Sequence, residues 1–415
     1  MKGGSIKEQI LERCVPEKEI PFSAAEYAQR LVQIKRRMAE PGVQMLYLSA
    51  PESLYYVSGY KAEWYQAQSP PDFPPVGGIA VHVDHEDFIL FDNEEEAVMC
   101  KYATIAKDIR IFAEEKQSDM LGWIVDELKK ERWIPCKVAL EMRSYRPNRV
   151  VSEMFQARLE SAGCDVVDGT DMVSECRSVK SPKELEYVAR AATIADVGIQ
   201  AARDAMSPGV TELQVYGAIV KAMADAGGEN PGITLPVVSG AKSACFHALA
   251  SRKKIRDGEI VVVDVCGVYN RYHANLARTF SIGEPDPAVA DIVRRSAAGF
   301  DRLADLIEPG MAVDALNREM KAYYEGAGLD DGLRWWVGGY ELGIAFPPDW
   351  VGSFVYDPSF DSGGRHFVPG TIVNFESNFY LPNNGGCSAI INTLAFSKDS
   401  ARILSQIPND LIVVQ

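Results

Sequence analysis

The first 175 residues contain apolar positions of two different periods. Short runs such as "VQMLYLS" and "FILFD" have the length and composition of β-strands. The segments "SDMLGWIVDELKKE" and "RVVSEMFQARLESAG" instead repeat apolar residues at the spacing of amphipathic helices. Strands that alternate with helices are typical of an α/β domain. The pattern therefore predicts an α/β domain over residues 1–175.

The pattern changes at residue 176. Ser181, Pro182 and Glu184 predict the start of a long helix, because a serine N-cap with glutamate three positions later is a capping box and proline favours the first helical position. Farther on, "EIVVVDVCGVYNRYHANLARTFSIG" alternates on both sides of a polar tip, which predicts a β-hairpin, and "GTIVNFESNFYLP" with "AIINTLAFS" predicts a second strand pair. We expect an α+β domain over residues 176–415, with helices on a curved antiparallel sheet.

Two acidic residues stand out in these strands. Asp264 ends a run of four consecutive isoleucine or valine positions. Glu376 shares its strand face with Asn374 and Asn378, a pattern that fits either a polar cavity or an exposed outer face. A buried carboxylate is costly unless it is paired, bound to a metal or shifted in pKa. His247 is a third candidate, because imidazole titrates nearest to neutral pH.

Composition narrows the possible partners. The 415 residues carry a formal charge of −15 and 47% hydrophobic content. Lysine and arginine are scattered without a basic run, which argues against nucleic acid and anionic membranes. The N-terminus lacks the apolar centre of a secretory signal, and the eight cysteines include no CxxC pair. We expect a cytoplasmic protein that acts on a small molecule and binds neither nucleic acid nor membrane.

Several motifs of the second half together resemble one known superfamily. They are "RSVKSPKELEYVARAA", "VVSGAKSACFH" with His247, "GEIVVVDVCG" with Asp264, "EPGM", "GGYELG", and "PGTIVNFES" with Glu376. In this combination they resemble the pita-bread superfamily of methionine aminopeptidase, proline dipeptidase, aminopeptidase P and creatinase. The two-domain layout resembles the last three. The resemblance implies a pita-bread catalytic domain behind a creatinase-like N-terminal domain.

Metal-using members of that superfamily hold two divalent ions through two aspartates, a histidine and two glutamates. Carried over singly, those positions fall on Asp264, Asn275, Tyr340, Glu376, and either Ile391 or Asn392. An amide, a phenol and an aliphatic side chain are poor ligands for ions that prefer carboxylate and imidazole. We therefore predict that the protein has no metal site and needs no cofactor.

Two further stretches, "GVYNRYHANLART" and "GYELGIAFPPDW", are similar to ectoine hydrolase, which with creatinase forms the metal-free branch of the superfamily. The resemblance implies a hydrolase that cleaves a C–N bond in a small nitrogenous solute. Such a solute is an ectoine-like cyclic amidine, a creatine-like guanidino compound or a small amide. His247 is then the acid/base, Asp264 the nucleophile or base, and Glu376 the partner of the positively charged nitrogens.

The resemblance and the aromatic pattern also suggest residues that contact the substrate. These candidates are His273, Tyr340, Trp350, Asn275, Trp64 and Tyr65. Aromatic faces favour cationic ligands, and His273 occupies the hairpin position where creatinase has a tyrosine that contacts substrate. The resemblance further implies a homodimer, in which the N-terminal domain of one subunit covers the site of the other.

Three other functions stay open at this point. One is a metal-dependent Xaa-Pro dipeptidase, and another is a metal-dependent lyase of the same fold. The third is a relative without catalysis that binds a ligand or partner. The retention of His247, Asp264 and Glu376 together favours an enzyme.

Overall fold

The structure is a computed structural model that describes residues 10, 12–62, 77–113, 119–329, 332–383 and 385–415. The chain divides into two compact units, Met1–Arg177 and Ser178–Gln415. The division falls next to the predicted domain junction. Each unit has its own sheet and its own hydrophobic core.

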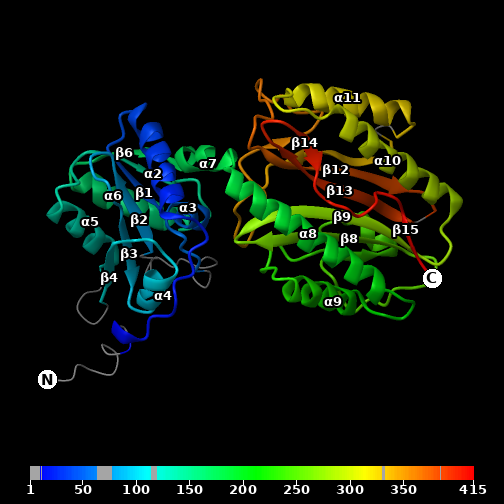
Figure 1. Ribbon diagram of the computed structural model, residues 1–415, viewed down its shortest axis with the longest axis horizontal. Coiled ribbons are helices and arrows are strands. Elements are labelled where there is room, and N and C mark those ends of the chain that lie inside the picture. The colour runs from blue at the N-terminus through cyan, green and yellow to red at the C-terminus, as the bar shows by residue number, and fades with distance from the viewer. Residues whose placement is uncertain (1–9, 11, 63–76, 114–118, 330–331, 384) are drawn as a thin grey trace. The chain divides into compact units, whose positions relative to one another are not determined.

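The first unit is an α/β domain, as predicted (Figure 1). Its sheet has the strand order β4-β3-β2-β1-β5-β6. The strands are β1 Met45–Leu48, β2 Gly78–His82, β3 Ile89–Asn93, β4 Asp108–Phe112, β5 Lys137–Leu140 and β6 Asp165–Asp168. The helices are α2 Ala24–Ala39, α3 Pro51–Ser58, α4 Ala97–Tyr102, α5 Met120–Lys130, α6 Arg149–Ser161 and α7 Thr170–Ser178. Strand β2 is antiparallel to β1 and β3, and the other pairs are parallel.

The second unit is built on a larger, mainly antiparallel sheet of order β11-β10-β12-β13-β9-β8-β7, with β14 beside β13 and β15 beside β9. The strands are β7 Val237–Ser239, β8 Ile260–Tyr269, β9 Tyr272–Ile282, β10 Arg334–Tyr340, β11 Val355–Tyr356, β12 Ile372–Leu381, β13 Gly386–Phe396, β14 Ala401–Ile403 and β15 Ile412–Val414. The helices are α8 Pro182–Ala205, α9 Glu212–Asp225, α10 Pro287–Leu306 and α11 Val313–Gly326, with a 3-10 turn η1 Gly240–Ala244. This is the predicted pita-bread architecture.

Helix α8 begins at the predicted capping box. The Ser181 hydroxyl accepts from the Glu184 backbone N–H (3.3 Å), and the Glu184 carboxylate accepts from the Ser181 backbone N–H (2.6 Å). These two bonds satisfy N–H groups that a helix start leaves without partners. The sequence signal for this helix is therefore confirmed.

Helices cover one face of the sheet and thereby define the other. Helix α8 lies along β8 and β9, and α10 lies along β12 and β13. Gly267 of β8 faces α8 so closely that an added Cβ would lie 1.9 Å from the Ala191 carbonyl oxygen. Ser377 of β12 hydrogen-bonds Ser296 of α10 (2.7 Å). Because side chains alternate along a strand, the neighbouring residue Glu376 faces away from the helices.

Over the described ranges, no helix combines the length and the apolar character that a bilayer crossing requires.

Candidate active site

A row of directly paired residues runs across four strands of the second sheet. Asp264 of β8 pairs with Ala277 of β9, which pairs with Ile391 of β13, which pairs with Glu376 of β12. Directly paired residues of antiparallel strands share a sheet face. The two carboxylates therefore lie on the same face, opposite the helices, and Ile391 rather than Asn392 is the β13 residue in the row.

The predicted β-hairpin is present. Strand β8 continues past Asp264 to Tyr269. The tip of the hairpin consists of Asn270 and Arg271, which both have positive φ values, 48° and 60°. His273 and Asn275 belong to β9.

Asparagine side chains surround both carboxylates. Asn275 donates through Nδ2 to Oδ1 of Asp264 (2.6 Å). Asn374 donates to Oε1 of Glu376 (2.8 Å), and Asn378 donates to Oε2 (2.9 Å). A further bond from Nδ2 of Asn374 to Oδ1 of Asn275 (3.0 Å) joins the two halves. The strand face of Glu376 is thus a buried polar network, and the alternative of an exposed outer face is excluded.

Burial in this network raises the pKa of both acids. The pKa of Glu376 rises to about 7, because burial outweighs the hydrogen bonds from Asn378, Asn374 and Tyr340. The pKa of Asp264 rises well above its ordinary range through burial and through repulsion by Glu376, against the hydrogen bond from Asn275. Two interacting buried carboxyl groups of this kind retain a proton near neutral pH.

The two acids open into a cavity of about 510 Å³. Its other walls are mainly aromatic and apolar, and they include Phe246, Trp335 and Trp336. No lysine or arginine is among the described residues that line it. The cavity thus has the size of a small-molecule site and an acidic floor without a cationic partner.

His247 lies on the wall of the same cavity. It follows η1 in the chain, and its ring contacts the rings of Trp335 (centroids 5.7 Å apart) and Phe246 (6.0 Å). The structure therefore brings His247, Asp264 and Glu376 to one cavity. These residues, far apart in sequence, are the three for which catalysis was predicted.

Tyr340 and Trp350 also line the cavity, at the positions proposed for substrate contact. Trp350 donates through Nε1 to the hydroxyl of Tyr340 (3.0 Å), and that hydroxyl lies 3.4 Å from Oδ1 of Asn275. Tyr340 thus extends the asparagine network to the cavity wall. Asn275 itself is 1% exposed and is bonded to Asp264 and Asn374 rather than lining the cavity.

The prediction that His273 contacts substrate requires correction. Its side chain is fully buried, Nδ1 donates to the Arg271 carbonyl (2.9 Å), and Nε2 accepts from the Gly232 backbone N–H (3.0 Å). Burial, together with the Arg271 charge, lowers the pKa of His273 to about 3. His273 is therefore a neutral residue that holds the loop before Ile233. Trp64 and Tyr65 lie outside the described residues.

The donor set at the carboxylates differs from that of the two-ion centre of the superfamily. Only Asp264 and Glu376 are suitable ligands, because Asn275, Tyr340 and Ile391 occupy the other three positions. Where cations would bind, N–H groups donate to Oδ1 of Asp264 and to both oxygens of Glu376. Over the described ranges, no group of three or more His, Cys, Asp or Glu residues could hold a metal ion. The residues present do not fit a dinuclear centre.

Comparison with known families agrees with this architecture. The profile of "Metallopeptidase family M24" matches residues 186–398, which is more than half of the chain. The chain belongs to metallopeptidase family M24. The profile "Creatinase/Prolidase N-terminal domain" matches residues 30–179. The resemblance to the pita-bread superfamily is confirmed, and M24 is a family of hydrolases.

The chain is similar to relatives with two different names. A Xaa-Pro dipeptidase of Pyrococcus furiosus is 25% identical over 388 residues, covering 92% of this chain and 99% of the relative. Ectoine hydrolase of Halomonas elongata is 23% identical over 415 residues, covering 95% and 98%. The X-Pro aminopeptidase structure from Thermotoga maritima MSB8 matches with a TM-score of 0.77 at 20% identity, covering 93% and 99%, which shows the shared fold.

Sequence reasoning missed two parts of the site. The loop of Ile233, Thr234 and Pro236 lines the cavity without any recognisable motif. Glu212, at the start of α9, anchors the segment that carries His247, yet acidic residues are common in the first turn of a helix. Only its burial distinguishes it, and burial here depends on residues distant in sequence.

Proposed function

We propose that the protein is a metal-independent hydrolase that cleaves a C–N bond in a small, positively charged or zwitterionic nitrogenous solute. The observation that carries this proposal is the buried pair of Asp264 and Glu376, whose oxygens accept hydrogen bonds from asparagine amides. Two acids with raised pKa values, beside a histidine on one cavity wall, supply both a proton donor and a proton acceptor near neutral pH.

The reaction then needs only groups of this chain, water and substrate. Asp264 takes a proton from a water molecule whose oxygen bonds to the substrate carbon, or attacks that carbon directly and is released by water. The electrons of the C–N bond return to the nitrogen, which takes a proton from His247 as it leaves. The proton released by the attacking water then passes to His247, which restores both groups. Glu376 pairs with the positive nitrogen and so favours the ionised form of the acid pair.

The cavity walls support a cationic group on the substrate. Trp335, Trp336 and Trp350 present aromatic surface to the cavity, and aromatic faces attract cations. The described lining contains no basic side chain that would compete for the carboxylates. An ectoine-like amidine, a creatine-like guanidino compound or a small amide beside an ammonium group fits this combination.

A metal-dependent Xaa-Pro dipeptidase is the second candidate, and the relatives favour it. The Pyrococcus furiosus relative carries that name and matches nearly its whole length. Against it stand Asn275, Tyr340 and Ile391, which replace three of the five ligands that the resemblance implies. The homodimer and the cytoplasmic location stay predictions.

The test is an activity panel of ectoine, creatine and Xaa-Pro dipeptides, each assayed with and without a metal chelator. We expect turnover of an amidine or guanidino compound that the chelator leaves unchanged. Cleavage of Xaa-Pro dipeptides that requires added manganese, cobalt or zinc and stops with chelator would replace the proposal by the second candidate.

A further inference from the structure

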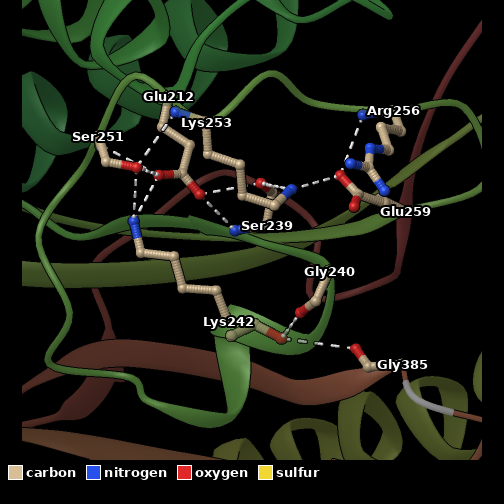
Figure 2. Close-up of polar contacts among 10 residues, drawn as sticks. Glu212, Ser239, Gly240, Lys242, Ser251, Lys253, Arg256, Glu259 and Gly385 are labelled. Atoms are coloured by element: carbon tan, nitrogen blue, oxygen red, sulfur yellow. Dashed lines mark hydrogen bonds and ion pairs between the residues drawn. The ribbon is translucent and has the colours of Figure 1, made fainter.

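Both ends of the segment that carries His247 are bonded to one buried carboxylate, that of Glu212, the first residue of α9 (Figure 2). Its side chain is 0% exposed. Oε1 accepts from the backbone N–H (3.0 Å) and the hydroxyl (2.9 Å) of Ser239. Oε2 accepts from Nζ of Lys242 (2.5 Å) and from the backbone N–H (3.0 Å) and hydroxyl (2.8 Å) of Ser251.

These partners lie on both sides of His247 in the chain. Ser239 is the last residue of β7, and Ser251 follows the cavity-lining residues. One carboxylate therefore closes the segment 240–250 at both ends. Lys242 adds a bond across the segment, from Nζ to the Leu249 carbonyl (2.7 Å), and so ties the two arms beside His247 to each other.

The carboxylate of Glu212 is ionised, and the hydrogen-bond network around it extends to Lys253 and Glu259. Burial would raise the pKa of Glu212, but hydrogen bonds from Lys242, Ser251 and Ser239 lower it below the ordinary value, so the group is ionised at neutral pH. On the far side, Lys253 donates to the Ser239 hydroxyl (2.7 Å) and to Glu259 (2.7 Å). Hydrogen bonds to an ionised, buried group are stronger than bonds between neutral groups.

We propose that Glu212 is a positioning residue for His247: it holds the segment 240–250 so that the imidazole stays on the cavity wall. This inference rests on the proposed function only for the role of His247 in proton transfer. A general acid acts efficiently only within hydrogen-bond reach of the reacting atom, and a surface segment that is not anchored samples many positions. Glu212 makes no hydrogen bond to Asp264 or Glu376; its side chain bonds Ser239, Lys242 and Ser251.

The test compares Glu212→Ala with Glu259→Gln, which removes a carboxylate of the same network on the side away from the cavity. Amide hydrogen exchange is measured by mass spectrometry for peptides covering 240–250. We expect exchange there to accelerate by about tenfold or more in Glu212→Ala, because bonds to a charged group are lost, and by less than about threefold in Glu259→Gln. Ser251→Ala loses the bonds of the hydroxyl to Glu212, Lys242 and the Lys253 backbone N–H but keeps its own backbone bond to Glu212. It is expected to give an intermediate acceleration and serves if Glu212→Ala does not fold.

A second readout follows the imidazole directly. In protein labelled with carbon-13 histidine, the ring protons of His247 carry a ring-current shift from Trp335, and His247→Gln identifies the signal. We expect this signal to move toward the free-histidine position in Glu212→Ala and Ser251→Ala, and to stay in place in Glu259→Gln. Equal exchange rates and equal His247 signals in all variants would overturn the proposal.

Activity separates this inference from the proposed function. If the His247 signal moves as expected and kcat on the best substrate of the panel falls while KM changes little, both stand. If the signal moves and kcat does not change, the positioning of His247 stands and its role in the reaction is wrong.

Discussion

The carboxyl pair makes a quantitative prediction about the pH dependence of stability. In the folded protein the pKa of Glu376 is about 7, against an ordinary value of 4.5. The folded state thus binds more protons than the unfolded state between these values, so the free energy of unfolding falls as pH rises from about 4.5 to 7. The loss is about 3 kcal/mol, because each pKa unit corresponds to about 1.4 kcal/mol.

Glu376→Gln removes this titration while keeping the shape of the side chain. The NH2 group of the new amide faces one of the two asparagine N–H groups, so two hydrogen-bond donors meet without an acceptor. This lowers the free energy of unfolding by about 1–3 kcal/mol at any pH. We expect the variant to be less stable than the parent at pH 5 and to lose this disadvantage, or reverse it, by pH 8. Removal of the Glu376 charge also lowers the pKa of Asp264, which adds to the change in the same direction.

The assay is urea unfolding followed by tryptophan fluorescence at pH 5, 6, 7 and 8. Glu341→Gln is the matched control. Burial would raise the pKa of Glu341, but the Lys180 charge and hydrogen bonds from Lys180 and Ser353 lower it. The contribution of ionised Glu341 to the free energy of unfolding is therefore fully present above its ordinary pKa and stays constant from pH 5 to 8. Parallel declines of the parent and Glu376→Gln over that range would refute the reasoning.

Three further predictions concern single side chains. His247→Gln should reduce kcat by about 10²- to 10⁴-fold with unchanged melting temperature. The control His366→Gln, at an exposed position, should leave kcat unchanged. Equal activities of the two variants would remove His247 from the mechanism. Asn275→Asp adds a third carboxyl group to the buried pair, next to Asp264. It should lower the free energy of unfolding by about 3 kcal/mol at pH 8 and by less at pH 5, as measured by urea unfolding over a pH series. His273→Phe leaves two backbone partners without hydrogen bonds and should cost about 2 kcal/mol at pH 8. The cost should be smaller at pH 5, because the unfolded histidine gains a proton below its ordinary pKa of 6.5 that the buried ring does not bind, which destabilises the parent but not the variant; a cost that grows toward low pH would contradict the neutral state of His273.

Local patterns predicted the elements of this fold and the orientation of one acid. The alternation along β12 placed Glu376 on the same face as Asn374 and Asn378, and the structure confirms it. The capping box at Ser181 is confirmed as well. Such features depend on residues two to four positions apart, so the sequence contains them directly.

Features that depend on distant residues were less predictable. His273 was expected to face the substrate, but its ring accepts from the Gly232 backbone N–H, which lies far away in the chain. Glu212 resembled an ordinary first-turn acid until Ser239 and Ser251 enclosed it. The alternation along β9 could not reveal the role of His273, and the helical pattern of α9 could not reveal that of Glu212. Tertiary partners rather than local spacing determine which polar groups are buried.

The central claim is that asparagine amides occupy the place of metal ions around Asp264 and Glu376. Elemental analysis tests it most directly, on protein dialysed against zinc, manganese and cobalt and then separated from unbound ions. We predict far less than one ion of any of these metals per chain. Two bound ions per chain, lost together on Glu376→Gln, would contradict the account.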